Sequence, residues 1–237
     1  MEIIILQDII FNVLLGSEFM KKRKRVTTKR NQRNRIIVER NYSGVTIVDS
    51  KDKLKDKPHL GGNVLEGDPY TFCPGVWSYV IERFAISSVL ELGSGVGYAA
   101  DFFYRKGLRT VAVDGLSDNV KKALYPTVCH DLTKGPVLTS VDLVHCHEVV
   151  EHIDKRFLEN LLLTLCCGRI ILMTHALPGQ GGHHHVNEKP DRYWAEHLAR
   201  RGYNLLAEDT KRIRAIAKSE GAAYMHASGL VFHKKRK

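Results

Sequence analysis

Polar and apolar positions between residues 70 and 233 follow two periods that alternate along the chain. Short apolar runs at 89–92, 109–114 and 141–146 are bounded by polar residues and glycines, which is typical of buried strands. In 74–84, by contrast, apolar residues recur at the spacing of an amphipathic helix. Strands that alternate with helices indicate a parallel sheet covered by helices on both faces. The pattern therefore predicts an α/β fold.

The same rhythm continues towards the C-terminus, where glycine and proline residues mark the ends of predicted helices. The further predicted helices cover residues 97–107, 118–125, 154–168, 190–202 and 211–218. The further predicted strands cover residues 127–130, 169–174, 203–207 and 228–233. A chain of this length is expected to hold one large α/β domain and an N-terminal extension.

A glycine-rich turn, Val-Leu-Glu-Leu-Gly-Ser-Gly-Val-Gly at 89–97, joins the first of these strands to the next helix. Glycines there let the backbone turn tightly and approach a ligand. Asp114 ends the following strand about 20 residues on, where such folds place a carboxylate on ribose hydroxyls. The third glycine of a dinucleotide fingerprint would fall at Tyr98, which argues against a nicotinamide oxidoreductase. The other interpretation is a tight connection without a ligand.

Glu91, followed by alternating glycines, resembles the first motif of class I S-adenosylmethionine-dependent methyltransferases. The resemblance covers roughly residues 70–233. It implies a Rossmann-like class I methyltransferase fold, with a seven-stranded, mostly parallel sheet and helices on both faces. It also implies that the last strand is antiparallel, that the domain covers 61–237, and that the cofactor is S-adenosyl-L-methionine.

Ligands of open parallel sheets bind beyond the carboxyl ends of the strands, and this rule selects the expected cofactor contacts. Glu91 and the glycine turn would hold the methionine end and Asp114 the ribose. The resemblance places Asp131 on the adenine amino group, although a turn cap is an alternative role. The expected cofactor-binding set is Glu91, Gly93, Ser94, Gly95, Gly97, Asp114, Gly115, Asp131, Leu132 and His147.

A Glu-x-x-Glu-His motif follows the fourth strand. If this segment is helical, Glu148, Glu151 and His152 share one face. Together with His185, from the loop after the fifth strand, they would form a site for Mg²⁺ or Mn²⁺. The arrangement is similar to that of the small-RNA 2′-O-methyltransferases that modify RNA 3′ ends, although the connecting loop here is shorter and nothing matches their RNA-binding domains. In the alternative interpretation, Glu151 and His152 orient the loop over the cofactor.

Nine of the twelve histidines lie between His130 and His197, which favours acid–base chemistry at one end of the sheet. A hydroxyl acceptor must lose its proton during methyl transfer, and His147, His175 and His185 are the candidate bases. No Asn-Pro-Pro-Tyr or Asp-Pro-Pro-Tyr sequence follows the fourth strand, which argues against methylation of DNA amino groups.

Together these features predict methyl transfer to an oxygen or nitrogen of a sugar, glycan or other small metabolite. The alternative is a metal-dependent RNA 2′-O-methyltransferase that uses Glu148, Glu151, His152 and His185. An alternative of another class is a non-catalytic binding module that has kept the fold.

The net charge of +10 is concentrated at the two ends of the chain. Residues 1–20 carry three acids and no Lys or Arg, 21–40 carry ten Lys or Arg and one acid, and 234–237 are all basic, so 41–233 carry no net charge. We expect 1–60 to be an extension with a disordered basic arm, because such a segment cannot form a core. The arm would contact RNA if RNA is the acceptor, and 21–25 also fits a nuclear targeting signal.

The apolar run 1–19 fits neither a signal peptide nor a membrane span, because Asp8 interrupts it and no basic residues precede it. Met20, directly before the basic run, is a candidate alternative start. The five cysteines are odd in number and form no Cys-x-x-Cys pair, which indicates reduced thiols in a cytoplasmic protein.

Overall fold

The computed structural model describes residues 4–5, 36–41, 44–49, 58–61 and 67–235. The strands are β1 (Ile4–Ile5), β2 (Ile36–Asn41), β3 (Gly44–Asp49), β4 (Ser88–Leu92), β5 (Arg109–Asp114), β6 (Thr127–Cys129), β7 (Val137–Leu138), β8 (Val141–Cys146), β9 (Gly168–Met173), β10 (Tyr203–Leu205) and β11 (Leu230–Lys234). The α-helices are α2 (Pro74–Phe84), α3 (Tyr98–Arg105), α4 (Ser117–Lys122), α5 (Leu158–Leu165), α6 (Asp191–Ala199), α7 (Ala207–Glu220) and α8 (Ala223–Ser228). The 3₁₀ turns are η2 (Pro58–Leu60), η3 (Pro69–Thr71), η4 (Val150–His152) and η5 (Lys155–Phe157).

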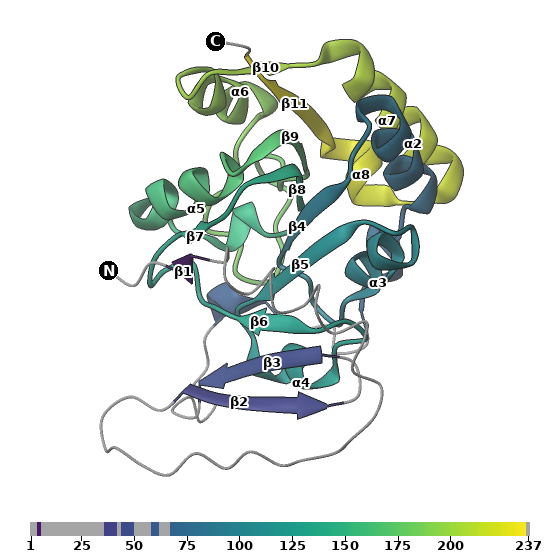
Figure 1. Ribbon diagram of the computed structural model, residues 1–237. Coiled ribbons are helices and arrows are strands. Elements are labelled where there is room, and N and C mark those ends of the chain that lie inside the picture. Colours follow the sequence, from purple (N-terminus) through teal and green to yellow (C-terminus); the bar gives the residue numbers. More distant parts are fainter. Residues whose placement is uncertain (1–3, 6–35, 42–43, 50–57, 62–66, 236–237) are drawn as a thin grey trace.

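One large sheet organises the described part of the chain, with the strand order β10-β11-β9-β8-β4-β5-β6-β3-β2 (Figure 1). Strands β6, β5, β4, β8 and β9 pair in parallel, and β11 is antiparallel to both β9 and β10. These strands, from β10 to β6, form the mostly parallel seven-stranded sheet that the sequence predicts. The Rossmann-like fold and the antiparallel last strand are therefore confirmed.

Two further strands extend this sheet from the N-terminal segment. β2 and β3 form an antiparallel hairpin, and β3 pairs in parallel with β6 at Ile47 and Val128. Part of the basic segment 21–40 thus belongs to an edge strand, consistent with the β-branched run at Ile36, Ile37 and Val38. Residues 1–3 and 6–35, which hold most of the expected arm, lie outside the described residues.

Helices cover both faces of the sheet, and side chains alternate between two apolar cores. On β9, Ile170 and Leu172 pack into the core with α2, α3, α7 and α8, whereas Ile171 and Met173 pack into the core with α5 and α6. Figure 1 shows these two groups of helices on opposite sides of the sheet. The alternation follows from the two-residue period of a strand, because successive side chains point to opposite faces.

Several local elements differ from the sequence-based expectations. The segment after β8 is not a continuous helix, because Glu148 has a left-handed backbone (φ 55°) and only Val150–His152 form a 3₁₀ turn. Asp154 caps η5 by accepting a hydrogen bond from the backbone N–H of Arg156 over 2.9 Å, and α5 begins later, at Leu158. Helix α8 and the short strand β7 were not anticipated.

Among the helices that the structure describes, none combines the length and the hydrophobicity needed to cross a membrane.

Candidate active site

A cavity of about 850 Å³ opens at the carboxyl ends of β4, β5 and β8. Its volume lies within the range of about 300–1,000 Å³ that is usual for ligand pockets. Most of the residues expected from the sequence line it: Glu91, Gly93, Ser94, Gly95, Asp114, Gly115, Leu132, His147, Glu148, His152 and His185. Gly97, Asp131, Glu151 and His175 do not. The described structure therefore brings the glycine turn, the strand-end acids and the histidine loop to one cavity.

The glycine turn faces the cavity with little more than backbone. Gly93 has φ 71° and Gly95 has φ 56°, a region that L residues rarely adopt. A Cβ on Gly93 would lie 2.2 Å from a methyl carbon of Val149, whereas a Cβ on Gly95 would meet nothing within 4 Å. The space beside Gly95 is thus available to a ligand. Gly97 serves instead as the left-handed N-cap of α3.

Asp114, at the end of β5, accepts three hydrogen bonds with its carboxylate. The backbone N–H of Gly95 donates to Oδ2 over 2.7 Å, and the N–H of Leu116 and the side-chain amide of Asn119 donate to Oδ1 over 2.8 and 3.2 Å. A carboxylate offers about four lone-pair sites, so room remains for one donor from a ligand. Burial raises the pKa of Asp114 to about 6, against the lowering effect of these bonds.

Glu91 is buried at the floor of the cavity and is held by a histidine that the sequence analysis did not select. His145 Nδ1 lies 2.7 Å from Glu91 Oε2, and the indole N–H of Trp77 donates to His145 Nε2 over 3.2 Å. Both imidazole nitrogens are thereby used within the protein. The arrangement fixes the position of the Glu91 carboxylate before any ligand binds.

Asp131, expected to contact adenine, does not itself line the cavity, and three protein groups bind its carboxylate. Its Oδ1 accepts bonds from the backbone N–H and the hydroxyl of Thr133, and its Oδ2 lies 3.1 Å from His59 Nε2. His59 and Leu60 line the cavity instead, and Leu60 packs so closely on Gly115 that a Cβ there would lie 2.6 Å from Leu60 Cδ2. Asp131 therefore positions the η2 turn, which covers this end of the cavity.

His147 is the cavity histidine with the fewest interactions. It is 7% exposed, and neither ring nitrogen has a hydrogen-bond partner. Its ring packs edge-to-face on His145, with centroids 5.8 Å apart. Burial, and to a smaller degree His145, lowers the pKa of His147 well below its usual range. The imidazole is therefore neutral near pH 7 and able to accept a proton.

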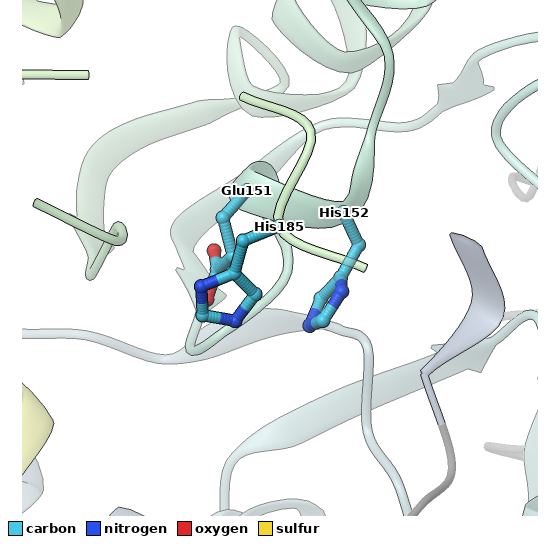
Figure 2. Close-up of side chains that lie close together, drawn as sticks. All are labelled: Glu151, His152 and His185. Atoms are coloured by element: carbon cyan, nitrogen blue, oxygen red, sulfur yellow. The ribbon is translucent and has the colours of Figure 1, made fainter. Parts of the chain in front are cut away.

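Glu151, His152 and His185 converge beside the cavity (Figure 2). One oxygen or nitrogen of each side chain lies within 4.8 Å of the other two, and the rings of His152 and His185 are 5.1 Å apart. Both carboxylate oxygens of Glu151 and Nδ1 of each histidine are buried without a hydrogen-bond partner. Buried polar atoms rarely remain unsatisfied, so the cluster has the character of an incomplete site.

Backbone hydrogen bonds bring the histidine loop to this cluster. The carbonyl oxygen of Glu151 accepts bonds from the N–H groups of Val186 and Asn187, both over 3.0 Å. Gly182 has φ 141°, and a Cβ there would lie 2.4 Å from His185 Cε1. The loop therefore passes against the His185 ring, which only a residue without a side chain permits.

Electrostatics at the cluster are unfavourable in the absence of a cation. Burial, followed by the neighbouring Glu148 carboxylate, raises the pKa of Glu151 well above its usual range. Burial also raises the pKa of Glu148, although a hydrogen bond from the Thr174 hydroxyl opposes this effect. Burial and then His185 lower the pKa of His152 to about 4. Two acidic side chains and the neutral imidazole of His152 are thus held beside His185, where a cation would stabilise the ionised carboxylates.

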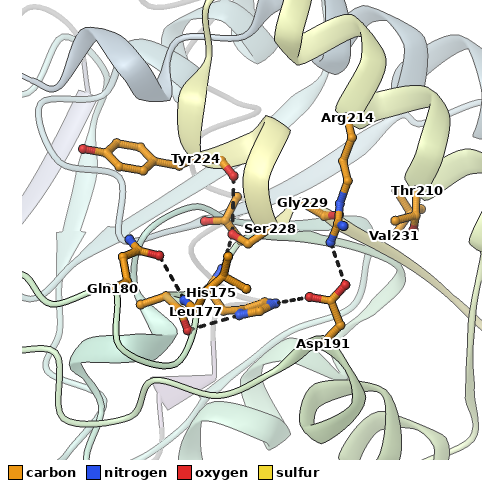
Figure 3. Close-up of polar contacts among 12 residues, drawn as sticks. His175, Leu177, Gln180, Asp191, Thr210, Arg214, Tyr224, Ser228, Gly229 and Val231 are labelled. Atoms are coloured by element: carbon orange, nitrogen blue, oxygen red, sulfur yellow. Dashed lines mark hydrogen bonds and ion pairs between the residues drawn. The ribbon is translucent and has the colours of Figure 1, made fainter.

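His175, a candidate base, is not among the residues that line the cavity, and Figure 3 shows its ring beside Asp191. Its Nε2 is 3.0 Å from Asp191 Oδ1, and the guanidinium of Arg214 donates to Asp191 Oδ2 over 2.8 Å. Its backbone N–H donates to Ser228 Oγ over 3.2 Å. These bonds link the chain after β9 to α6, α7 and α8, so the geometry gives His175 a structural role.

Sequence reasoning missed several residues that line the cavity, among them His59, Phe72, Trp77, Asn119, Gln180 and Tyr224. Two of them had a weak signal, because Phe72 and Trp77 belong to the aromatic-rich start of the domain. Tyr224 had none, since α8 has only six residues and no clear apolar period.

Comparisons with known proteins agree with the fold. Residues 90–165 match a family model described as a methyltransferase domain. The methyltransferase domain of bacterial CtHen1-C is 14% identical with a TM-score of 0.51, over 71% of this chain and 100% of that one. Magnesium protoporphyrin IX methyltransferase from Synechocystis PCC 6803, solved with bound SAM, is 16% identical with a TM-score of 0.45, over 55% of this chain and 66% of that one. No protein among the curated sequences matches this chain.

The domain match favours an enzyme over the non-catalytic module that the sequence left open. Residues 90–165 span β4 to α5 and contain the glycine turn, Asp114 and the Glu-x-x-Glu-His segment. The chain thus carries a methyltransferase domain of the Rossmann-like class I fold, and it is an S-adenosylmethionine-dependent methyltransferase.

Proposed function

We propose that this enzyme transfers a methyl group to a hydroxyl oxygen and uses a divalent cation held by Glu148, Glu151, His152 and His185. The observation that carries the proposal is the convergence of Glu151, His152 and His185 within 4.8 Å. Both carboxylate oxygens of Glu151 and Nδ1 of each histidine have no hydrogen-bond partner, and His185 Nδ1 lies 3.7 Å from Glu188 Oε1. Glu148 adjoins this group closely enough for its carboxylate to raise the pKa of Glu151.

The cofactor half of the cavity fits S-adenosylmethionine, which supplies a methyl group on a positively charged sulfur. The open space at Gly95 admits a ligand against the backbone, and Asp114 retains an acceptor site for a ribose hydroxyl. Glu91 adds negative charge at the floor of the cavity. Expected contacts with Ser94, Gly115, Leu132 and His147 are part of the same proposal.

The donor set of the second half fits a hard or borderline divalent cation such as Mg²⁺ or Mn²⁺. Carboxylate oxygens and imidazole nitrogens are present, and no cysteine is among them. A bound divalent cation supplies Lewis acidity, which lowers the pKa of a hydroxyl that it contacts. The protein contributes a fixed, partly buried ligand set that the loop at 182–187 completes.

His147 is the residue that we assign as proton acceptor. The acceptor oxygen forms a bond to the methyl carbon while the carbon–sulfur bond breaks, and the electron pair remains on sulfur. The hydroxyl proton passes to a ring nitrogen of His147, which lines the cavity and has no hydrogen-bond partner in the protein. His185 is then a metal ligand rather than a base.

A sugar, glycan or other small metabolite is the proposed acceptor, and RNA is the alternative. The RNA alternative depends on the Glu-x-x-Glu-His motif and on the basic arm at 21–40, most of which lies outside the described residues. It predicts oligonucleotide binding that weakens steeply with salt and is lost when 21–40 are deleted. A small-molecule enzyme keeps its turnover after that deletion.

Mn²⁺ binding tests the proposal independently of the acceptor. Titration followed by electron paramagnetic resonance should find one tight site in the wild type, and Glu151→Gln or His185→Ala should abolish it. His184→Asn is the matched control, because it alters the adjacent histidine at a left-handed position (φ 52°) that Asn tolerates. Full Mn²⁺ affinity in Glu151→Gln, or methyl transfer unaffected by chelators, would contradict the proposed role of the metal.

A further inference from the structure

Exposed aromatic side chains are among the residues that line the cavity. Phe72 and Tyr98 line the cavity and are 46% and 50% exposed, and Tyr224 lines it in a half-buried position. Tyr70, which is 56% exposed, packs edge-to-face on Tyr224 with centroids 6.3 Å apart. Exposed aromatic side chains gathered at a cavity are typical of ligand-binding sites. We refer to Tyr70, Phe72, Tyr98 and Tyr224 as the aromatic rim.

Hydrogen bonds hold the aromatic rim in place before a ligand binds. The hydroxyl of Tyr224 donates to Asp68 Oδ2 over 2.9 Å, and the backbone N–H of Tyr70 donates to Asp68 Oδ1 over 2.9 Å. Phe72 packs edge-to-face on the buried ring of Trp77, with centroids 5.3 Å apart. A rim fixed in this way loses little side-chain entropy when it contacts a ligand.

Tyr224 lines the same cavity as the candidate metal ligands Glu148, His152 and His185. Burial, then Asp68, and to a smaller degree Glu148 raise the pKa of Tyr224 to about 12, which places the Glu148 carboxylate within electrostatic range of that ring. Gln180, from the same loop as His185, also lines the cavity. A molecule in contact with both the rim and the cluster would therefore occupy the acceptor half.

Charge in the cavity is strongly one-sided. Its lining, as far as the described residues define it, includes the carboxylates of Asp68, Glu91, Asp114 and Glu148 but neither lysine nor arginine. An anionic group on the acceptor that lay away from the proposed cation would be next to carboxylates, with no lysine or arginine among the described lining residues. Burying an unpaired charge is costly, so such an acceptor is disfavoured.

From the rim and the charge together, we infer that the acceptor carries a flat aromatic ring and no anionic group. The ring packs on Phe72, Tyr98 and Tyr224, and its hydroxyl points towards Glu148 and His185. This inference rests on the proposed function for the position of the hydroxyl. Among the proposed acceptors it selects an aromatic metabolite over a sugar or glycan, and it excludes carboxylated phenols. Contact with a flat ring gains from aromatic packing that an aliphatic ring lacks.

Three probes of matched size separate the ring from the charge. Catechol is flat and neutral, cis-1,2-cyclohexanediol keeps the two hydroxyls without the flat ring, and 3,4-dihydroxybenzoate adds a carboxylate to catechol. Calorimetry on the full chain saturated with S-adenosylhomocysteine, first with chelator and then with Mg²⁺, should give catechol an advantage of about fivefold or more over each of the others. Equal affinities in chelator, or tighter binding of the carboxylate, would overturn the inference.

Variants test whether the rim supplies that preference. Phe72→Leu and Tyr98→Leu should reduce catechol binding to the level of the cyclohexanediol. Tyr104→Leu should leave it unchanged, since Tyr104 lies on the same helix as Tyr98 and is 59% exposed but does not line the cavity. If Phe72→Leu and Tyr98→Leu instead weaken only S-adenosylhomocysteine, the rim belongs to the cofactor and the inference fails.

The measurements in chelator and in Mg²⁺ distinguish this inference from the proposed metal site. A rim-dependent preference for catechol in chelator that Mg²⁺ does not strengthen would remove the metal and leave the ring assignment in place. Strengthening by Mg²⁺ without rim dependence would do the reverse. Binding of a short oligouridine that competes with catechol and weakens with salt would replace the neutral ring acceptor by RNA.

Discussion

Glu91 and His145 form a hydrogen bond of 2.7 Å, and both side chains are almost completely buried, at 3% and 1% exposure. The indole N–H of Trp77 requires an acceptor, so His145 Nε2 carries no proton and Nδ1 carries the one that it donates to Glu91. The pair is therefore a neutral imidazole bonded to a carboxylate. Glu91 reaches the cavity in a fixed orientation, because His145 from β8 binds its carboxylate and Trp77 from α2 in turn binds His145.

His145→Ala should destabilise the protein and weaken cofactor binding together. Removing the imidazole leaves the buried Glu91 carboxylate without its hydrogen-bond donor, which costs about 1–3 kcal/mol or more for a charged group. Trp77→Phe is the milder control, which keeps an aromatic ring and loses one hydrogen bond worth about 1 kcal/mol. Urea unfolding measures both effects. A loss below that of Trp77→Phe would show that Glu91 does not depend on His145.

Two alanine substitutions in the glycine turn should separate folding from binding. Both introduce a side chain at positive φ, which costs about 1–2 kcal/mol. Gly93→Ala also forces a Cβ to within 2.2 Å of Val149, so it should lower the unfolding free energy further. Gly95→Ala meets no protein atom, so its additional effect should be lost affinity for S-adenosylhomocysteine. Calorimetric affinities unchanged in Gly95→Ala would mean that the cofactor lies elsewhere.

Asp114 should make cofactor binding depend on pH. Burial raises its pKa from a usual 3.8 to about 6, so the carboxylate that would accept a ribose hydroxyl becomes protonated below that pH. Affinity for S-adenosylhomocysteine should fall about tenfold between pH 7 and pH 5, because about one carboxylate in ten remains ionised one unit below the pKa.

Stability of the ligand-free protein should change in the opposite direction. Between about pH 4 and pH 6 the folded state binds more protons at Asp114 than the unfolded state, so the unfolding free energy decreases as pH rises through this window. Asp114→Asn should remove both dependences. A wild-type affinity that is constant from pH 5 to pH 7 would argue against the ribose contact.

The sequence was sufficient for those site residues whose position depends on local structure. Gly95 and Asp114 follow from a glycine turn and from a strand that ends in an acid, because the parallel sheet places both at one edge. His185 could also be predicted, because the loop that carries it returns to the Glu-x-x-Glu-His segment. In the structure, backbone bonds from Val186 and Asn187 to Glu151 accomplish this return.

Residues whose environment depends on distant partners were not predictable. Asp131 was expected to contact the adenine amino group. In the structure its carboxylate contacts His59, which is 72 positions away in the sequence and belongs to the η2 turn. His175 was a candidate base, and in the structure its ring faces Asp191, which Arg214 in turn binds. Tyr224 belongs to a short helix that no periodicity marks. These contacts form only after the sheet and its covering helices have assembled.

Gly182 provides a test of the metal site that leaves every proposed ligand unchanged. Gly182→Ala would place a Cβ 2.4 Å from His185 Cε1, so the imidazole must move. Mn²⁺ affinity should then fall about tenfold or more, since displaced supporting groups typically cost 10–100-fold in metal affinity. Gly181→Ala is the matched control, because it also has positive φ (67°) but meets no atom within 4 Å. Both variants strain the same loop, so an equal loss of Mn²⁺ affinity in the two would attribute the effect to the backbone. An unchanged Mn²⁺ affinity in Gly182→Ala would remove His185 from the ligand set.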